Sequence, residues 1–249
     1  MTIPPDHPRY RSLMVREMLS EMVDKGLVSQ TGLISHGRGE AFDYLMGERT
    51  LPSALVAEKA AAAYLLGALR PVICVNGNAA ALARMSLIDL SEQVPAKIEV
   101  NIFHRTEERM DLLISYMEET GAKVLGRNPD AKIPGLSSDR ALCTKEGIFN
   151  SDVILVPIED GDRAKALVNM KKVVISIDIN PLSRTSKTAT VSICDEITRA
   201  VENIIGFVQD MRGRPDEILR TIRSYDNFKV REETVKEICS YLLKEVRME

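Results

Sequence analysis

Tryptophan is absent from this chain, and aromatic residues as a whole make up only 4% of its 249 residues. The interior must therefore be filled by aliphatic side chains, alanine and methionine. Such a composition favours helices packed on a β-sheet over an aromatic-rich all-β fold. Hydrophobic residues reach 45% and charged residues 28%, which indicates an ordinary globular protein rather than a disordered one.

Cysteine is scarce and widely spaced. The four cysteines, Cys74, Cys143, Cys194 and Cys239, form no C-x-x-C pair. This spacing argues against a zinc site and against a disulfide-dense secreted scaffold. We interpret Cys74 and Cys194 as small apolar strand residues, and we expect a reducing compartment, the cytoplasm.

The chain has neither a basic surplus nor a long apolar run. The formal net charge is −3, and basic residues are not interleaved with aromatic ones, so we expect no nucleic acid as a partner. A local arginine cluster for a small anion remains compatible with this balance. The Ala/Leu-rich stretch Leu51–Leu69 is interrupted by Glu58 and Lys59, and the first residues lack the pattern of a signal peptide. We therefore expect no membrane attachment.

Two common nucleotide-binding fingerprints are also missing. Around Gly32–Glu40 the spacing is not that of a Walker A loop, because Arg38 stands where lysine is required and Gly39 where serine or threonine is required. No G-x-G-x-x-G follows a predicted strand and opens a helix. The second absence counts against a nicotinamide-dependent oxidoreductase.

A β–α rhythm is present from Pro71 onward. Short apolar runs alternate with helical segments, and the predicted strands are 71–75, 98–103, 124–125, 152–158, 173–177 and 188–193. Strands that alternate with helices pair in parallel through right-handed crossovers. The sequence therefore predicts an α/β fold, a Rossmann-like open parallel sheet with helices on both faces. The long segment 127–151 is expected to be a functional loop.

Helical extensions precede and follow this core. Apolar spacing predicts one helix from Tyr10 to Gly26 and another from Pro52, with a flexible glycine-rich corner at 32–40 and a short helix at 41–45 between them. The C-terminus carries a helical apolar stripe: Val235, Ile238, Cys239, Leu242, Leu243 and Val246. We expect an N-terminal helical segment (1–70) packed on a nucleotide- and substrate-binding core (71–212), then C-terminal helices (213–249), all in one structural unit.

Four polar clusters directly follow predicted strands. They are Asn76–Asn78, His104–Thr106, Glu159–Arg163, and Asp178–Asn180 with Ser183 and Arg184 close behind. Ligands of open α/β sheets bind beyond the carboxyl ends of the strands, where turns and helix N-termini gather. The sequence therefore predicts a pocket for small anionic ligands at one edge of the sheet.

Each cluster also has a purely structural interpretation. Asn76, Gly77 and Asn78 offer backbone amides to a phosphate or carboxylate, or they form a tight turn with an asparagine cap. Arg105 precedes a capped helix, which suits an anion, but a solvated surface arginine is equally compatible. Asp178 stands where nucleotide binders place a carboxylate against a ribose or base, or it is an ordinary turn residue.

Other acidic and basic residues also allow either a ligand-binding or a purely structural interpretation. Asp160 and Asp162 suit Mg²⁺, which uses one or two carboxylates with phosphate oxygens and water, but acidic residues also favour the first turn of a helix. His36 and Arg38 lie between glycines and are placed to close on a ligand. Arg16 belongs to a predicted helix whose arginines would ordinarily be solvated.

Longer strings of residues, taken in order, resemble the archaeal-type phosphopantothenate synthetases, the 4-phosphopantoate–β-alanine ligases. The strings that carry the resemblance are His7–Tyr10, Arg16–Glu17, Gly32–Leu45, Val75–Leu82, Arg105–Glu107, Ile133–Leu136, Pro157–Arg163 and Ile177–Arg184. The resemblance extends to about Asp195 and is weaker in the C-terminal helices.

The resemblance implies a Rossmann-like homodimer in coenzyme A biosynthesis. The family joins 4-phosphopantoate to β-alanine and converts ATP to AMP and pyrophosphate. The ATP contacts that it implies are Arg16, Arg38, Asp178, Ile179, Asn180, Arg184, Thr185, Glu196 and Ile197. The chain departs from the family at one of them, because Glu196 stands after Asp195 where the family has an amide. A carboxylate there would face the base or ribose rather than phosphate.

The residues suit this chemistry. A carboxylate that attacks the α-phosphate brings two anions together, and arginines with Mg²⁺ must offset their charge. Arg16, Arg38 and Arg184 are the expected triphosphate clamps. The candidates for the phosphopantoate end are Asn76, Gly77, Asn78, Arg105 and Lys132, and the candidates for catalytic roles are Arg38, His36 and Asn78. His36 and His104 are both available to accept the proton of β-alanine, and the loop 132–136 is expected to exclude water from the adenylate.

Two other functions stay open on the residues alone. One is a nicotinamide-dependent oxidoreductase. If the protein had this function, bound NAD or NADP would protect it against thermal unfolding. The other is a non-catalytic nucleotide sensor that uses a dimer as its output. Only the ligase is expected to form AMP when all three substrates are supplied.

Overall fold

One parallel β-sheet organises the protein. The computed structural model describes residues 3–247, and its six-stranded sheet has the order β3-β2-β1-β6-β7-β8, with every neighbouring pair parallel. The strands are β1 (Pro71–Val75), β2 (Lys97–Val100), β3 (Val124–Leu125), β6 (Val153–Pro157), β7 (Val173–Ile177) and β8 (Val191–Ile193). The strand order reverses between β1 and β6, which is where ligands of such sheets bind. The predicted Rossmann-like α/β class is confirmed.

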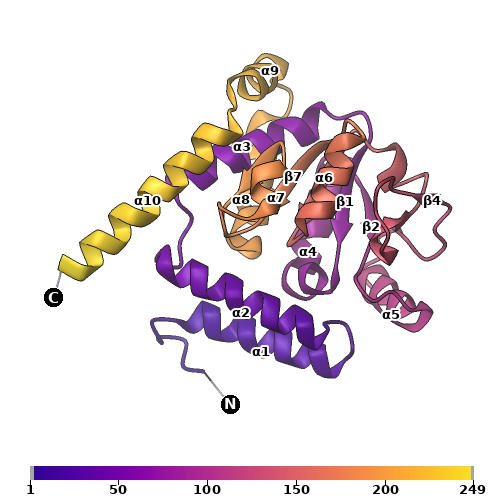
Figure 1. The fold of residues 1–249 in the computed structure, drawn as a ribbon, viewed down its shortest axis with the longest axis horizontal. Coiled ribbons are helices and arrows are strands. Elements are labelled where there is room, and N and C mark those ends of the chain that lie inside the picture. Colours follow the sequence, from indigo (N-terminus) through magenta and orange to yellow (C-terminus); the bar gives the residue numbers. More distant parts are fainter. Residues whose placement is uncertain (1–2, 248–249) are drawn as a thin grey trace.

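Helices cover both faces of the sheet (Figure 1). Because successive side chains of a strand point to opposite faces, Ile73 and Val75 join the larger core cluster, whereas Val72 and Cys74 join a smaller one. The helices in the larger cluster include α3 (Pro52–Gly67), α4 (Gly77–Gln93), α5 (Glu107–Glu118) and α8 (Ile197–Met211). Helix α6 (Gly161–Asn169) packs in the smaller one. Burial on both faces explains why the strands are continuous apolar runs.

The N-terminal part differs from the prediction of a glycine-rich corner followed by a short helix. Helices α1 (Tyr10–Asp24) and α2 (Gln30–Leu45) lie side by side, and 32–40 is helix interior, not a flexible corner followed by a short helix. The side chain of Ser29 starts α2 by accepting a hydrogen bond from the Gly32 amide. Glycine lowers helix propensity, but close packing compensates for it here. A Cβ on Gly32 would lie 2.6 Å from Oδ1 of Asn78.

The segment 127–151 is ordered, contrary to the expectation of a long loop. It contains a short antiparallel ladder of β4 (Ala131–Lys132) and β5 (Leu142–Cys143), followed by a single helical turn at Ile148–Asn150. Buried Glu99 of β2 accepts hydrogen bonds from the amides of Thr144 and Ile148 at 2.7 Å each. A carboxylate from the sheet thus organises a segment that has no periodic pattern of its own.

The last predicted strand begins later than expected. Residues 184–188 form a short helix, α7 (Arg184–Thr188), and β8 starts only at Val191. Ser183 caps α7 by accepting a hydrogen bond from the Ser186 amide. A cap residue at this point starts a helical turn that the apolar pattern does not indicate.

The C-terminus is helical, as predicted. Helix α9 (Pro215–Ser224) and helix α10 (Asn227–Arg247) follow α8, and the first part of α10 packs on α3 before the helix extends away from the body (Figure 1). Over the described residues, no helix combines the length and apolar character needed to cross a membrane. Residues of α1 and α3 share the core cluster of the sheet, and the division at 70 and 212 remains a prediction.

Candidate active site

The largest cavity lies beyond the carboxyl ends of β6, β7 and β8, where α2 faces the turns that follow these strands. Its volume is 970 Å³. The residues that line it from α2 are Ser35, His36, Arg38, Gly39, Ala41, Phe42 and Leu45. The residues that line it from the strand ends include Ile158–Gly161, Ile177–Asn180, Ser183–Thr185 and Asp195–Ile197. Two of the four predicted polar clusters, those that follow β6 and β7, therefore meet at this cavity, and the other two do not.

The turn after β7 is held rigidly at the wall of this cavity. Asp178 accepts hydrogen bonds from the Asn180 amide at 3.1 Å and from the hydroxyl of Ser183. Burial raises the pKa of Asp178, and its hydrogen bonds and Arg38 act in the opposite direction. Arg38 is exposed, and no ion pair to it is found among residues 3–247. The turn and Arg38 thus face the same space from opposite sides.

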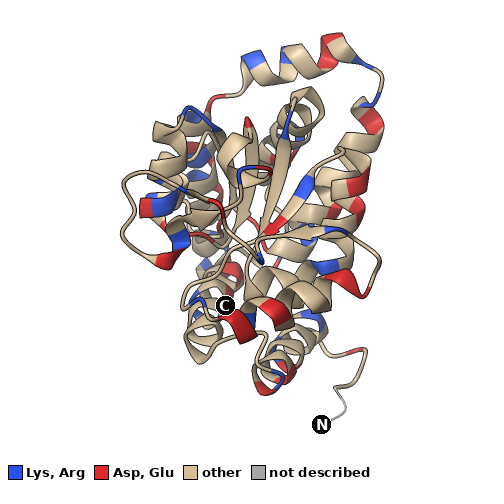
Figure 2. Ribbon diagram, turned by 90° about the vertical axis from the view of Figure 1, so that its right-hand side faces the viewer, with Lys and Arg blue, Asp and Glu red and all other residues tan. Residues whose placement is uncertain are grey.

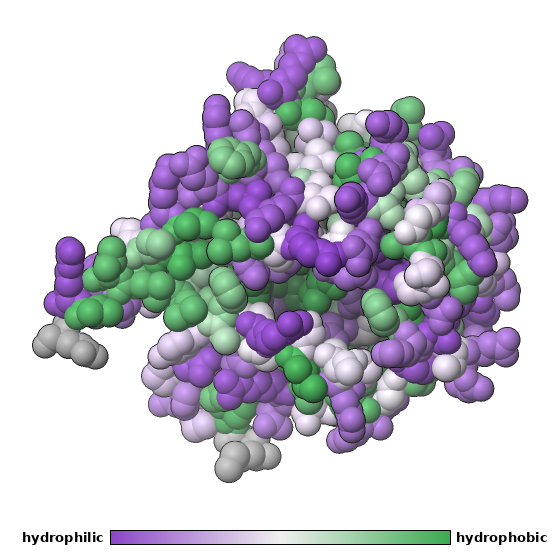
Figure 3. All heavy atoms as spheres, viewed as in Figure 1, coloured by the Kyte–Doolittle hydropathy of each residue, from purple (hydrophilic) through white to green (hydrophobic). Residues whose placement is uncertain are grey.

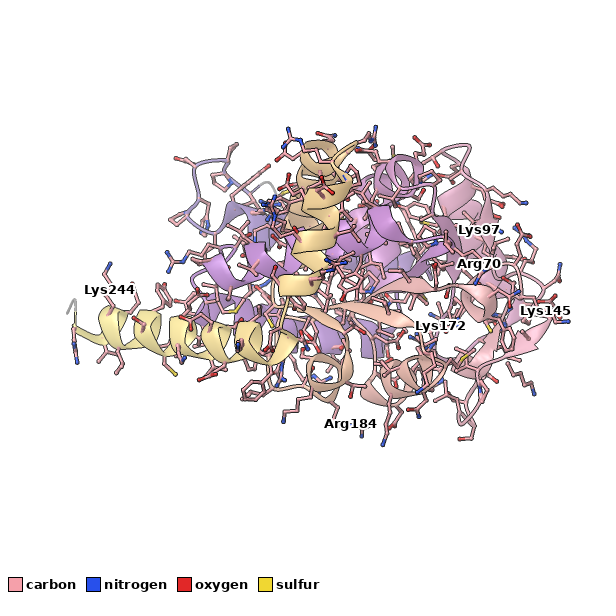
Figure 4. The ribbon with its side chains drawn as sticks, turned by 90° about the horizontal axis from the view of Figure 1, so that it is seen from above. Arg70, Lys97, Lys145, Lys172, Arg184 and Lys244 are labelled. Atoms are coloured by element: carbon pink, nitrogen blue, oxygen red, sulfur yellow. The ribbon has the colours of Figure 1, made fainter. Side chains whose placement is uncertain are left out.

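The turn after β6 carries the predicted metal candidates. Asp160 caps α6 through a 2.8 Å hydrogen bond from the Arg163 amide, and Asp162 forms an ion pair with Arg184. Arg184 is 69% exposed and points away from the body in Figure 4. Thr185 donates a hydrogen bond to the Glu159 carbonyl at 2.7 Å, which ties the β6 and β7 turns together. Asp160 lines the cavity, whereas Asp162 lies outside its lining.

A buried ionic group beneath this turn was not predicted from the sequence. The carboxylate of Glu159 pairs with both Arg140 and Arg163, and all three side chains are almost fully buried. Burial alone would raise the pKa of Glu159, but the two guanidinium groups reverse the effect and lower it. The spacing of Glu159 and Arg163 by one helical turn was the only signal available in the sequence.

A second buried group supports the start of α8. Arg199 pairs with Asp43 of α2 and with Asp195, which accepts a hydrogen bond from Thr50 at 2.5 Å. Glu58 of α3 lies beside it, and burial together with the charge of Asp195 raises the pKa of Glu58 to about 9. Burial also raises the pKa of Asp43. This cluster fixes the position of the Asp195–Ile197 wall of the cavity relative to α2.

A smaller cavity of 110 Å³ adjoins the large one between α1, α2 and the start of α8. His36, Ile179 and Glu196 line both cavities. The other residues of its lining are Pro8, Arg9, Arg11, Ser12, Val15, Glu40, Asp43, Glu48 and Arg199. The N-terminal residues 8–15 were not predicted as site residues, apart from their share in the family resemblance.

Several predicted residues lie outside the large cavity. Arg16 is 49% exposed and pairs with Glu40 at 2.6 Å. Asn76 caps α4 and donates to the carbonyls of Pro157 and Ile158, while the amide of Asn78 donates to the Gly32 carbonyl. A Cβ on Gly77 would lie 2.4 Å from the Leu27 carbonyl oxygen. In this structure the cluster after β1 therefore packs against the connection between α1 and α2.

The candidates for the phosphopantoate end are also spread out. Arg105 donates hydrogen bonds to the carbonyls of Gly126 and Arg127 and lines a separate polar cavity of 540 Å³ beyond β2 and β3. Lys132, in β4, lines none of the three cavities. Within the described part of the chain, no three histidine, cysteine, aspartate or glutamate side chains are grouped as a metal site.

Comparison with known proteins identifies the family. Residues 53–241 match the model of the family described as phosphopantothenate/pantothenate synthetase. The chain belongs to the phosphopantothenate/pantothenate synthetase family. The matched residues contain every strand of the sheet and the Asp178–Ile197 side of the large cavity, whereas α1 and α2 precede them.

Relatives of this synthetase family match nearly the whole chain. A protein of Methanosarcina mazei named 4-phosphopantoate–β-alanine ligase is 53% identical over 242 residues, which cover 96% of this chain and 95% of the relative. A protein of the same name from Methanospirillum hungatei is 53% identical over 209 residues, 84% of this chain and 86% of the relative. A protein of the same name from Thermococcus kodakarensis is 45% identical over 232 residues, which cover 92% of this chain and 89% of the relative.

Proposed function

We propose that the protein is an ATP-dependent ligase that joins 4-phosphopantoate to β-alanine in coenzyme A biosynthesis and releases AMP and pyrophosphate. The observation that carries the proposal is the 970 Å³ cavity, in which Arg38 of α2 faces the Asp178–Asn180 turn and Arg184. The relatives that match most of the chain bear the name of this ligase. A nicotinamide-dependent oxidoreductase has no comparable support.

The cavity suits a nucleotide together with a small acid. Its volume is at the upper end of the range of about 300–1,000 Å³ typical of ligand sites. Apolar side chains such as Phe42, Ile158 and Ile197 offer a surface for the adenine ring, and Asp178 and Asn180 offer hydrogen bonds to the ribose or base. We assign the ATP contacts to Arg38, Asp178–Asn180, Arg184, Thr185 and the Glu196–Ile197 wall, with Arg16 nearby on α1.

The first chemical step needs positive charge. The carboxylate oxygen of 4-phosphopantoate attacks the α-phosphorus of ATP, a P–O bond forms, and pyrophosphate leaves with the electron pair of the broken bond. Both reactants are anions, so the exposed guanidinium groups of Arg38 and Arg184 would lower the barrier by offsetting their charge. The rigid Asp178 turn would keep the nucleotide in line for attack.

The acidic residues at the start of α6 are compatible with Mg²⁺. One or two carboxylates combined with phosphate oxygens and water form a common Mg²⁺ site, so no cage of protein ligands is required. Asp160 lines the cavity and retains one carboxylate oxygen beyond its capping bond, and Asp162 is adjacent on the same turn. Mg²⁺ bound there would neutralise charge on the triphosphate.

We further propose a cytoplasmic homodimer without nucleic-acid or membrane partners. In the ribbon of Figure 2 the positions of Lys and Arg are interspersed with those of Asp and Glu and do not gather on one side of the view. An apolar strip runs along the projecting part of α10 (Figure 3), where Leu243 is 58% and Val246 is 77% exposed. An exposed apolar face on a helix that extends from the body suits association with a second copy.

One experiment separates the candidate functions. The protein is incubated with ATP, Mg²⁺, 4-phosphopantoate and β-alanine, and AMP and 4′-phosphopantothenate are measured. The ligase requires both products to accumulate in equal amounts. A nucleotide sensor would bind ATP without forming AMP, and that result would overturn the proposal.

A further inference from the structure

The smaller cavity has a size and a charge pattern of its own. Its volume of 110 Å³ is well below the range of about 300–1,000 Å³ typical of ligand sites, so it suits a compound of a few heavy atoms rather than a nucleotide. It opens onto the large cavity where His36, Ile179 and Glu196 line both. Helix α2 lies between the two cavities. His36, Glu40 and Asp43 share one helical face and line the smaller cavity. Ser35, Arg38 and Phe42 lie on a different face and line the large cavity.

Most of the charged groups around the smaller cavity are already paired with one another. Arg9 bonds Glu48 and Glu40, and Arg199 bonds Asp43 and Asp195. These pairs give the walls a fixed shape, and they leave little capacity to bind a ligand ionically. The groups that remain available therefore decide what the cavity can recognise.

Two acceptor atoms remain at the boundary with the large cavity. Glu196 is 8% exposed, and its Oε2 accepts from the amide and hydroxyl of Thr198, but its buried Oε1 has no hydrogen-bond partner within residues 3–247. The buried Nε2 of His36 likewise has none in the described chain. A buried acceptor without a partner costs free energy, which a donor such as an ammonium group would recover.

The lining of the smaller cavity also contains an exposed positive charge. Arg11 is 56% exposed, its Nη2 bonds the Thr198 hydroxyl at 2.9 Å, and its only acidic neighbour within 4 Å in the described chain is the exposed Glu202, at 3.6 Å. Exposed ion pairs of this kind contribute little, so the guanidinium can turn to a carboxylate. The lining of the cavity thus offers acceptors at its boundary with the large cavity and an exposed guanidinium on the other side of the Thr198 hydroxyl.

We propose that this cavity is the β-alanine subsite, with the ammonium group directed to His36 and Glu196 and the carboxylate directed to Arg11. The proposal rests on the ligase function and specifies where its second substrate binds. A small zwitterion matches the volume, the separation of charges and the position beside the cavity assigned to ATP and 4-phosphopantoate.

In the second chemical step, the amine of β-alanine in the smaller cavity reacts with the adenylate in the large cavity. Nε2 of His36 takes a proton from the ammonium group, and the lone pair of the free amine forms a C–N bond with the acyl carbon of the adenylate. The bond from that carbon to the phosphate oxygen breaks, and AMP leaves with its electron pair. The second proton on nitrogen passes to solvent as the amide forms.

The surroundings of His36 keep it able to accept that proton. Burial lowers its pKa, and Arg16 on α1 acts in the same direction. Glu40 and Asp43 on α2 and Glu196 before α8 raise the pKa, but burial outweighs them. The imidazole is therefore neutral near pH 7, as a general base must be.

Separate assays of the two steps test the subsite. Exchange of labelled pyrophosphate into ATP, with 4-phosphopantoate and without β-alanine, reports only the first step. We expect Arg11→Ala to raise the KM for β-alanine by about tenfold or more, as loss of a charged hydrogen bond does, while the exchange rate changes by less than about twofold. Arg214→Ala is the matched control, because Arg214 is 66% exposed and pairs with a glutamate at 3.5 Å outside the site.

His36→Gln provides an independent readout. We expect it to lower the kcat for β-alanine by about 10²-fold, the usual contribution of a general base, with exchange retained. Hydroxylamine is largely unprotonated at neutral pH, so its capture of the adenylate as a hydroxamate should proceed in His36→Gln as in the unaltered protein. A purely structural role for His36 would impair both nucleophiles alike.

The outcomes separate the two proposals. No pyrophosphate exchange in the unaltered protein would overturn the ligase function and the subsite with it. Exchange combined with an unchanged KM for β-alanine in Arg11→Ala would overturn the subsite alone. An Arg11→Ala effect on the KM for ATP instead would assign the smaller cavity to the nucleotide.

Discussion

Arginine residues in this protein divide by burial, and the division decides which of them can bind substrate. Arg140 and Arg163 are almost fully buried and both pair with the carboxylate of Glu159, so their charges are already engaged beneath the turn after β6. Arg38 is exposed at the large cavity and has no ion pair in the described chain, whereas Arg184 is exposed there and pairs with Asp162. A guanidinium whose charge is not already offset is the group that gains most from a triphosphate.

Arg38 is the exposed arginine of the large cavity whose replacement tests the first chemical step. Replacement by alanine removes a charge that faces the developing negative charge of the first step, and we expect kcat for pyrophosphate exchange to fall by about 10²-fold. The thermal unfolding temperature should stay unchanged, because the side chain has no ion pair in the described chain. Exchange at the normal rate would remove Arg38 from the site.

Arg105 tests the assignment of the phosphopantoate end. If the phosphate of the substrate reaches the 540 Å³ cavity of Arg105, then Arg105→Ala lowers kcat/KM for 4-phosphopantoate by about tenfold or more, with the KM for ATP unchanged. Arg105 also bonds two backbone carbonyls, so the unfolding temperature of the variant must be measured in parallel. An unchanged kcat/KM would restrict the phosphate to the large cavity.

The raised pKa of Glu58 makes the stability of the folded protein depend on pH. Its pKa is raised in the folded state to about 9, from an ordinary value of 4.5, so the folded protein binds a proton more tightly than the unfolded chain does. The stability from this group is fully present below about pH 4.5 and is lost as the pH rises toward 9, with a slope of at most about 1.4 kcal/mol per pH unit. Denaturant titrations at several pH values should show a smaller decline for Glu58→Gln. An identical decline in both proteins would contradict the assignment.

At the scale of elements, α2 is the connection between the helical N-terminal part and the sheet. Its two faces line two different cavities, and its C-terminal half is anchored to α8 through Asp43 and Arg199. A continuous helix places His36 and Arg38 at defined positions, which a flexible corner would not do. The position of α2 is therefore set by contacts with α4 and α8 rather than by its own glycine-rich sequence.

Two helical glycines allow this packing to be tested. A Cβ on Gly77 would lie 2.4 Å from the Leu27 carbonyl oxygen, whereas a Cβ on Gly37 of α2 would meet no atom within 4 Å. We expect Gly77→Ala to destabilise the protein by about 1–3 kcal/mol through overpacking, and Gly37→Ala to stabilise it by up to about 1 kcal/mol through helix propensity. Denaturant titration measures both. Unchanged stability with lost activity in Gly77→Ala would instead favour the anion-binding interpretation of this turn.

At the scale of the whole molecule, α10 extends beyond the body and exposes apolar side chains. Lys244 marks the far part of this helix in Figure 4. We expect the unaltered protein to sediment as a dimer and the double variant Leu243→Glu, Val246→Glu to sediment as a monomer, because two buried charges would oppose association. Lys244→Glu changes charge on the same helix and should leave the mass unaffected. A monomeric unaltered protein would refute the dimer.

Local sequence determined the elements of this protein to a large extent. Short continuous apolar runs such as Pro71–Val75 favour strands covered on both faces, and their alternation with helices predicts a parallel sheet with its polar turns at the carboxyl ends. Long residue strings also indicated the family that the comparisons identify. These properties depend on periodicity and on neighbouring residues, which the sequence displays directly.

Only the tertiary structure decided which polar turns share a cavity. The turns after β6, β7 and β8 meet α2, whereas the turn after β1 is covered by Leu27 and that after β2 opens onto a separate space. The helical course of 32–40, the order within 127–151 and the buried partners of Glu159 depend on contacts between residues far apart in the chain. Burial and pairing over such distances leave no periodic signal in the sequence. The sequence therefore indicated candidate site residues but not which of them line the same cavity.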